Sequence, residues 1–282
     1  MSEGIEKRET YEIEFLYRPG QSHDELQLQR LVAELRDVAA TCFSEIPDYQ
    51  CLAGTRAELA DKVITIARRS DGTAAGFCSA ALLPVDKVGD VFHLGLTCVR
   101  PEDRSAGLTH KLTSRVVIQY LVKYKPLSKV WVSNVACVLS SLGNVALNFE
   151  EVYPSPYFAK NQPSRNHERI ALSINSLYRD KIYIRGDAKF DTKKFVFRGS
   201  VQDTCFQKAQ NDTRFHHRDV RLNDYYSDLM SWSAGDEILQ IGSVSLLTGV
   251  KYYFKKLAQQ LPGRSRLAGS RRPAGEGASE AA

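Results

Sequence analysis

A short run of small and basic residues at positions 104–109 has the composition of a phosphate-binding turn. It reads Arg104, Ser105, Ala106, Gly107, Leu108 and Thr109, and it is followed by apolar residues at helical spacing. The first amides of a helix have no intrahelical acceptor and point along its axis, so a helix that begins here would present N–H groups to an anion. Small side chains let a pyrophosphate approach the backbone, and Gly107 can adopt a positive φ. Arg104 and Lys111 could add charge-assisted bonds.

The elements on either side of this turn follow from the spacing of apolar residues. Before the turn, residues 90–99 alternate between apolar and small or polar positions, which predicts a buried strand. After it, apolar residues recur at three- and four-residue spacing, which predicts a helix. Its stripe is Leu108, Leu112, Val116, Val117, Tyr120 and Leu121. The turn is therefore expected where a buried strand passes directly into a helix.

The remaining elements predict an ordered α/β arrangement up to about Pro154. Alternation predicts a strand from Tyr11, and a capping box of Ser22 and Glu25 opens a helix over 23–44. A second helix is expected near 55–62. An Asp-Gly turn at 70–73 joins two strands, and a strand at 130–135 precedes a helix near 140–152. The predicted order is β-α-α-β-β-β-α-β-α.

The pattern beyond Pro154 is weaker. Strands are predicted at 168–175, 181–185 and 194–198, and helices at 220–232 and 245–260. We expect a flexible N-terminus over 1–10, a main domain over 11–175, an extension over 176–261 packed on it, and a basic disordered tail over 262–282.

Two stretches together resemble the GNAT superfamily of N-acetyltransferases. The Arg-x-x-Gly-x-Thr sequence at 104–109, after a strand that ends in Thr97-Cys98-Val99-Arg100-Pro101, is similar to the coenzyme A motif Arg/Gln-x-x-Gly-x-Gly/Ala, with Thr109 as the departure. Val130-Trp131-Val132-Ser133-Asn134 resembles the next strand of that family. The resemblance covers about residues 11–175, with specific motifs only over 90–152.

The resemblance implies a fold, a cofactor and a set of contacts. The fold would be a mixed, mostly antiparallel twisted sheet flanked by helices, in which two neighbouring strands splay apart. The co-substrate would be acetyl-CoA or another acyl-CoA, without a metal. Backbone of Thr97, Cys98 and Val99 would contact the thioester and pantetheine, residues 104–109 would hold the pyrophosphate, and Asn134 would add a polar contact. The reaction would be transfer of the acyl group to a primary amine of a small molecule or peptide.

Such a transfer needs groups that move protons. The incoming amine needs a base, the developing oxyanion a strand amide, and the leaving thiolate a donor. Phe149 stands where the family often has a tyrosine, so Tyr153 or Tyr157 would replace it, or the thiolate leaves without a protein acid. His93, which by strand alternation shares a face with Gly95 and Thr97, is the first candidate base. Asp90 and Asp48 are the alternatives.

The cysteines, histidines and net charge favour no other class of site. Six cysteines lack metal-ligand spacing and are expected to be reduced and mostly buried, although Cys98 and Cys137 lie near the motifs. His216 and His217 have no metal-spaced partner. Of the net charge of +5, four arginines and two glutamates put +2 in the tail, and +3 on the body is too little to indicate nucleic-acid binding. Without a long apolar run or a signal peptide, the chain is expected to be soluble and cytoplasmic, bound to no membrane.

Three functional classes therefore stay open. The first is an active acyl-CoA N-acyltransferase. The second is a catalytically silent module that binds acyl-CoA as a sensor or scaffold, which Phe149 favours. The third keeps the fold but binds no cofactor. The amine, the acyl chain length and the oligomeric state do not follow from the sequence.

Overall fold

The computed structural model describes residues 10–160 and 162–248. These residues form one mixed sheet of nine strands in the order β1-β2-β3-β4-β5-β9-β8-β7, with β6 paired to β9. Among these strands the β4–β5 pair is parallel and the other pairs are antiparallel. The strands are β1 (Glu12–Tyr17), β2 (Lys62–Arg68), β3 (Ala74–Val85), β4 (Gly89–Val99), β5 (Val130–Ala136), β6 (Glu150–Tyr153), β7 (Lys189–Asp191), β8 (Val196–Arg198) and β9 (Glu237–Val244).

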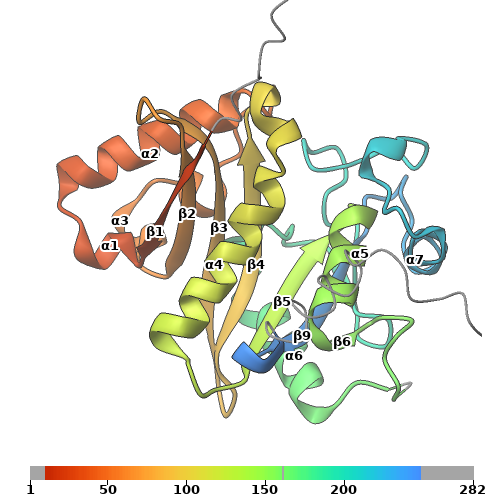
Figure 1. The fold of residues 1–282 in the computed structure, drawn as a ribbon. Helices are drawn as coiled ribbons and strands as arrows, with labels where there is room; N and C mark the ends of the chain where they lie inside the picture. The colour runs from red at the N-terminus through yellow and green to blue at the C-terminus, as the bar shows by residue number, and fades with distance from the viewer. Residues whose placement is uncertain (1–9, 161, 249–282) are drawn as a thin grey trace, which may run out of the picture.

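Helices cover both faces of the sheet. The α-helices are α1 (Pro19–Ser22), α2 (Glu25–Ala40), α3 (Arg56–Leu59), α4 (Leu108–Tyr124), α5 (Leu139–Asn148), α6 (Arg165–Leu177) and α7 (Val220–Ser227), and the 3₁₀ helices are η1 (Gln50–Leu52), η2 (Pro101–Ala106), η3 (Asp180–Ile182) and η4 (Thr213–Phe215). Helix α4 lies over β2–β4 and α5 over β5 and β9, on the same face (Figure 1). Helices α2 and α6 pack on the opposite face. The mixed, mostly antiparallel sheet flanked by helices that was expected is confirmed.

The two faces follow from strand alternation. In β4, Phe92 belongs to the core under α4, whereas Val91 packs with residues of α6 on the other side. In β3, Cys78 faces α4 and Phe77 faces α2. Because successive strand residues point to opposite faces, these strands read as nearly continuous apolar runs that supply two cores.

Helix α2 lies where the apolar spacing predicted a helix, but its cap and its end differ from the prediction. Its buried residues recur at three- and four-residue spacing: Leu28, Leu31, Leu35, Val38 and Ala39. The capping box, however, is formed by Asp24 and Gln27, whose side chains each bond the other's backbone amide, and the helix ends at Ala40. The Ser22 and Glu25 box and the boundary at 44 were therefore misplaced.

The structure differs most from the prediction after Pro154. Residues 165–177 form helix α6, capped by Ser164, where a strand was predicted over 168–175. Residues 180–182 form a 3₁₀ helix where the strand at 181–185 was predicted, whereas β8 confirms the strand near 194–198. Most of the helix predicted at 245–260 lies outside the described residues.

The strand β9 was missed, and it is central. All eight of its residues are buried, and it pairs with β5 along the whole of that strand. Figure 1 shows β9, in blue, directly beside β5. The region predicted as an extension over 176–261 therefore contributes an inner strand to the main sheet.

Candidate functional site

The strands β4 and β5 pair over a short length and then separate. Their parallel register joins Phe92–Leu94 to Val132–Asn134, and from Gly95 onward β4 has no strand partner on that side among the described residues. Leu94, Gly95 and Thr97 remain partly exposed although β4 lies inside the sheet. Unpaired strand edges need a hydrogen-bonding partner or water. The splay between β4 and β5 (Figure 1) is therefore an edge to which an extended ligand can bind.

A β-bulge in β4 marks the point where the splay begins. Cys78 pairs with Thr97 and Ala80 with Leu94, so Ser79 alone opposes Gly95 and Leu96. A bulge shifts the alternation of the strand by one residue. Leu96 and Cys98 consequently pack with α2, and Thr97 turns toward Cys78 on the α4 face. The expectation that Thr97 shares a face with His93 was wrong for this reason.

Glycine at position 95 is required by close packing at the bulge. A Cβ on Gly95 would lie 2.7 Å from Cδ of Gln50 and 2.8 Å from the carbonyl oxygen of Ser79. The Gln50 side chain, which is buried, accepts a hydrogen bond of 3.3 Å from the Ser79 hydroxyl. The α2 side of the bulge is thus closed by Gln50, whereas β4 stays accessible from other directions.

The predicted phosphate-binding turn is a short 3₁₀ helix followed by a left-handed glycine. Residues 101–106 form η2, Gly107 has φ 67° and ψ 26°, and α4 begins at Leu108. In a 3₁₀ helix each amide bonds to the carbonyl three residues earlier, so the amides of 104–106 are less available than an open loop would make them. The Lys111 amide donates to the Gly107 carbonyl, so the amides of 108 and 109 precede the first bond of α4. The donors for an anion therefore centre on residues 107–109.

The surroundings of Gly107 suit a bulky anion. Gly107 and Thr109 are exposed, and among the described residues no atom lies within 4 Å of where a Cβ on Gly107 would be. The left-handed Gly107 separates the turn from α4. The Cα of Gly107 therefore leaves room for a phosphate at the amides of the first turn of α4.

A buried carboxylate fixes this turn to the sheet. Asp103 is 3% exposed and accepts hydrogen bonds from the Tyr11 hydroxyl at 2.7 Å and from Nη2 of Arg69 at 2.5 Å. Arg69 also bonds to Glu102 at 2.9 Å. Charge-assisted bonds of this kind are short and directional. Asp103 thus holds η2 against β1 and the β2–β3 hairpin.

Arg104 points toward Cys42 in this structure. Its Nε donates to the carbonyl of Val99 at 3.3 Å, and its Nη2 lies 3.9 Å from the sulfur of Cys42. A hydrogen bond from the thiol of Cys98 lowers the pKa of Cys42, and Arg104 contributes in the same direction. The carbonyl oxygen of Val99 also lies 3.4 Å from the sulfur of Cys42. A phosphate contact from Arg104 would therefore require its guanidinium to turn away from Val99.

His93 is buried against the neighbouring strand. It is 1% exposed, and its Nδ1 lies 3.0 Å from the Ser133 hydroxyl. Burial, together with the positive charge of Lys62, lowers its pKa to about 3. The imidazole is therefore neutral at physiological pH and a weak base. Its predicted catalytic role stays a prediction.

Tyr153 lies in the same row of the sheet as His93 but three strands away. The row runs from His93 on β4 through Ser133 on β5 and Ile241 on β9 to Tyr153 on β6. At about 4.8 Å per strand the two are separated by about 14 Å. The Tyr153 hydroxyl donates to the carbonyl of Lys193 at 2.9 Å. The structure therefore does not bring these two predicted proton carriers to one reacting atom.

The other predicted residues have structural partners. Tyr157 bonds to Asp219 at 3.3 Å, Asp90 pairs with Arg18 at 3.6 Å, and Asp48 is exposed. Phe149, at the end of α5, packs against the core under α4.

Asn134 is buried beneath α5 rather than open to the splay. Its side-chain amide donates to Gln240 at 3.2 Å, and Gln240 in turn donates to the Tyr226 hydroxyl at 2.7 Å. Asn134 is 5% exposed. Its side chain therefore joins β5 to β9, and its predicted cofactor contact stays a prediction.

A polar and aromatic cluster on the α2 side of the splay was not predicted from the sequence. Tyr49, Tyr183 and Phe206 form a ring cluster with centroids 4.9–5.8 Å apart, and each ring is partly exposed. The backbone carbonyl of Phe206 accepts from the Cys137 thiol at 3.4 Å, just beyond β5. A buried carboxylate, Glu237 at the start of β9, lies nearby. These residues come from three distant segments, and Glu237 beside the apolar run of 238–244 was the signal that could have been noticed.

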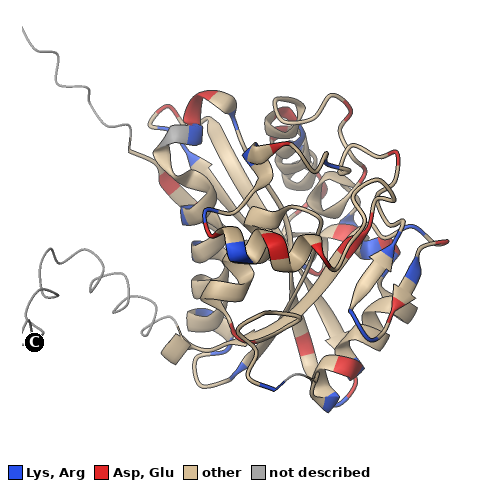
Figure 2. Ribbon diagram, turned by 90° about the vertical axis from the view of Figure 1, so that its right-hand side faces the viewer, with Lys and Arg blue, Asp and Glu red and all other residues tan. Residues whose placement is uncertain are grey.

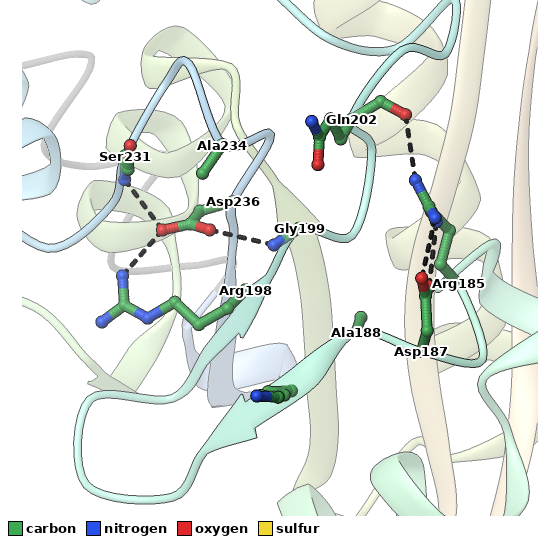
Figure 3. Close-up of a pocket in the computed structure, with 10 residues that line it drawn as sticks. Arg185, Asp187, Ala188, Arg198, Gly199, Gln202, Ser231, Ala234 and Asp236 are labelled. Atoms are coloured by element: carbon green, nitrogen blue, oxygen red, sulfur yellow. Dashed lines mark hydrogen bonds and ion pairs between the residues drawn. The ribbon is translucent and has the colours of Figure 1, made fainter.

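Two surface clefts lie away from the splay. One, of about 470 Å³, lies between β8, the segment at 185–189 and the loop before β9 (Figure 3). Its guanidinium groups are paired: Arg185 with Asp187, and Arg198 with Asp236 at 2.7 Å. The other, of about 690 Å³, is lined by Tyr153, Phe190, Phe195 and residues of α6. Neither cleft is lined by β4 or by the turn at 104–109.

Charges of both signs are interspersed on the described part of the chain. Figure 2 shows Lys and Arg alternating with Asp and Glu over the side it faces, and many of them form ion pairs. Within the ranges 10–160 and 162–248, no group of three or more His, Cys, Asp or Glu residues is arranged to hold a metal ion. No helix in the same ranges is both long and apolar enough to cross a bilayer.

Comparison with known proteins returns neither a family model nor a curated protein that matches. Solved structures of GNAT-type enzymes do match. An acyl-CoA N-acyltransferase from Pseudomonas aeruginosa is 19% identical over 52% of this chain and 93% of its own, with a TM-score of 0.37. An aminoglycoside N-acetyltransferase in complex with CoA is 21% identical over 43% of this chain and 75% of its own, with a TM-score of 0.29.

A third match is a region of a larger protein. It is a fungal multi-domain β-N-acetylglucosaminidase with a region described as a glucosamine N-acetyltransferase, 15% identical over 44% of this chain, with a TM-score of 0.29. This chain spans only 13% of that protein. In this chain, α4 joins the parallel strands β4 and β5, which splay apart, and α5 follows β5. This is the arrangement that the resemblance implied. The described residues thus have the mixed sheet, flanked by helices, that was expected from the resemblance.

Proposed function

We propose that the protein is an acyl-CoA-dependent N-acyltransferase that uses acetyl-CoA or a related thioester. The observation that carries the proposal is the splay of β4 from β5, with the left-handed Gly107 at the start of α4 directly after it. This arrangement combines an unpaired strand edge with an anion site a few residues further along the chain. Pantetheine and diphosphate, two of the three parts of coenzyme A, require these two features.

The residues fit two parts of the co-substrate, the diphosphate and the pantetheine. The open space at Gly107, with the amides of 108 and 109, suits the diphosphate. The edge of β4 from Gly95 to Val99 offers backbone groups to the amides of pantetheine. A strand amide at the same edge would stabilise the oxyanion that forms when an amine attacks the thioester carbonyl. Arg104 and Asn134, both engaged within the protein, are proposed as secondary contacts.

The acceptor is proposed to be a primary amine of a small molecule or peptide. The α2 side of the splay carries the ring cluster of Tyr49, Tyr183 and Phe206, whose aromatic faces can bind the apolar part or the cationic group of an amine. The predicted roles of His93 and Tyr153 in proton transfer remain proposals, each to be tested by its own variant.

A catalytically silent acyl-CoA-binding module is the alternative. Phe149 favours it, because a phenyl ring packed into the core cannot protonate a thiolate. The distance of about 14 Å between Tyr153 and His93 in the sheet also favours a silent module. A silent module would keep the cofactor site at Gly107 and lack turnover.

One pair of measurements decides between these functions. Release of free coenzyme A thiol is followed with a thiol reagent while acetyl-CoA is mixed with glucosamine, an aminoglycoside, a polyamine or a short peptide. Thermal unfolding is measured with and without acetyl-CoA, since a ligand that binds only the native state raises Tm. Thiol release that depends on the amine supports the transferase. A raised Tm without thiol release supports the silent module, and no change in Tm refutes both.

A further inference from the structure

Glu237 is the first residue of β9 and lies beside the end of β5. Ile238 pairs with Ala136, the last residue of β5, so Glu237 stands next to Cys137 just beyond the paired region. In β9, Leu239 and Ile241 pack on the α6 side of the sheet, and alternation puts Glu237 on that same face. This is the face that carries α2 and the ring cluster.

Glu237 also contributes to the raised pKa values of two neighbouring residues. Burial raises the pKa of Tyr49, and the negative charge of Glu237 adds to that shift. Burial raises the pKa of Cys137 to about 12, again with a contribution from Glu237. Cys137 bonds to the Phe206 carbonyl, and the ring of Phe206 contacts that of Tyr49 at 5.8 Å. Cys137, which stands beside Glu237 at the end of β5, therefore links this end of the sheet to the partly exposed rings.

The carboxylate of Glu237 is buried and has few hydrogen-bonding or charged partners among the described residues. Glu237 is 8% exposed, and its Oε2 accepts one hydrogen bond, from the Ser200 hydroxyl at 2.6 Å. Within the described part of the chain, no donor contacts Oε1 and no cation pairs with the group. Burial raises its pKa to about 7, which the Ser200 bond partly offsets. A buried carboxylate without a cation is costly, and glutamine would fill the same space without a charge.

We propose that Glu237 is the general base that takes the proton from the attacking amine. This inference rests on the proposed transferase function. The nitrogen forms a bond to the acyl carbon, the bond from that carbon to sulfur breaks, and the electron pair leaves with the sulfur. The proton on nitrogen passes to Oε1 of Glu237 and then to the thiolate, so the overall reaction consumes no proton. A base with a pKa near the working pH suits this transfer.

The groups that face the carboxylate are consistent with this role. Ser200 holds Oε2, Tyr49 and Cys137 stay protonated because their pKa values are raised, and no charged side chain of another described element contacts the carboxylate. Gln50 and Tyr183, both at the ring cluster, have positive φ values of 54° and 62°, which non-glycine residues rarely adopt. Strained backbone of this kind accumulates at functional sites.

The test compares Glu237→Gln with two other variants over about pH 5.5 to 9. Thiol release is measured with the best amine, and acetyl-CoA affinity is measured separately to confirm an intact fold. For the wild type, kcat/KM should rise with pH through about 7 and then level off. Glu237→Gln should lower kcat by about 100-fold or more and should lose the rise of kcat/KM with pH, while its acetyl-CoA affinity stays unchanged.

The other two variants keep the test decisive. Ser200→Ala removes the bond that lowers the pKa of Glu237, so the rise of kcat/KM should move to higher pH while activity on the plateau persists. Glu12→Gln, an exposed carboxylate on β1, should match the wild type. If Glu237→Gln does not fold, the Ser200→Ala shift alone decides the matter.

The outcomes distinguish failure of the proposed role of Glu237 from failure of the proposed transferase function. Equal rates and pH profiles for the wild type, Glu237→Gln and Ser200→Ala would overturn the role of Glu237 and leave the transferase intact. A wild type that binds acetyl-CoA but releases no thiol with any amine would overturn both. An upward shift in Ser200→Ala, together with the loss in Glu237→Gln, would support both.

Discussion

Substitution of Gly107 by alanine separates backbone strain from cofactor binding. Gly107 has φ 67°, and a Cβ there meets no atom within 4 Å, so alanine introduces strain without a clash. Placing an L-residue in the left-handed region costs about 1–2 kcal/mol. For a domain of this size the expected fall in Tm is about 2–8 °C. A diphosphate held against the Cα would in addition lose one hydrogen bond to a charged group, worth about 1.5–3 kcal/mol.

Gly72 provides the matched control. It has φ 87° in the β2–β3 hairpin, and a Cβ there also meets nothing within 4 Å. Both alanine variants should lose a similar amount of stability by urea unfolding. By titration calorimetry, only Gly107→Ala should bind acetyl-CoA about 10- to 100-fold more weakly. If Gly107→Ala lost stability but bound acetyl-CoA as tightly as the wild type, the diphosphate would not lie at this turn.

Three other changes test parts of the same region. Asp103→Asn removes the charge that accepts from Arg69 and should lower the free energy of unfolding by about 1–3 kcal/mol in urea titrations; unchanged stability would contradict the anchoring role. His93 has its pKa lowered from 6.5 to about 3, so the unfolded state binds more protons between these values and stability falls as pH drops below about 6.5. His93→Gln should remove that part of the acid sensitivity in pH-dependent unfolding, and equal slopes would refute burial of a neutral imidazole. Cys42, with its lowered pKa, should react with iodoacetamide at neutral pH faster than Cys205, whose pKa burial raises; peptide mass spectrometry after timed quenching measures both, and equal rates would argue against a thiolate at Cys42.

The elements before Pro154 could be predicted because local signals there agree with the tertiary structure. The Asp71-Gly72 turn joins two apolar runs, and the predicted hairpin forms between β2 and β3. Thr65 and Phe77 lie in strands that sit inside the sheet with both faces covered, so the apolar runs were long and distinct. The order of elements through α5 followed from these runs.

The later elements needed information that local patterns lack. Residues Ile170, Ala171 and Ile174 bury one face of α6 at helical spacing, but the short apolar run within 168–175 also suited a strand. The strand β9 contains Gln240 and Ser243, whose side chains bond to distant residues such as Leu142 and Glu150. Its place beside β5 is a long-range pairing that no local signal encodes.

The site was predicted where it depends on contiguous sequence and missed where it does not. The turn at 104–109 was recognised because its residues adjoin in the chain, although the 3₁₀ form of η2 was not foreseen. The face assigned to Thr97 was wrong because a bulge cannot be seen in one strand without its partner. Glu237 and the ring cluster meet only after β9 and the 180–206 segment pack against η1 and β5.

The bulge opposite Ser79 also makes the length of β4 intolerant of change. Deleting one residue at 95 or 96 would restore a regular ladder with β3, in which Thr97 and Cys98 keep their present partners Cys78 and Phe77 and their present faces. The deletion would instead remove the bend that the bulge introduces where β4 leaves β5. Insertions and deletions in related chains should therefore accumulate in the hairpin tips at 70–73 and 86–89 and be rare between Leu94 and Thr97.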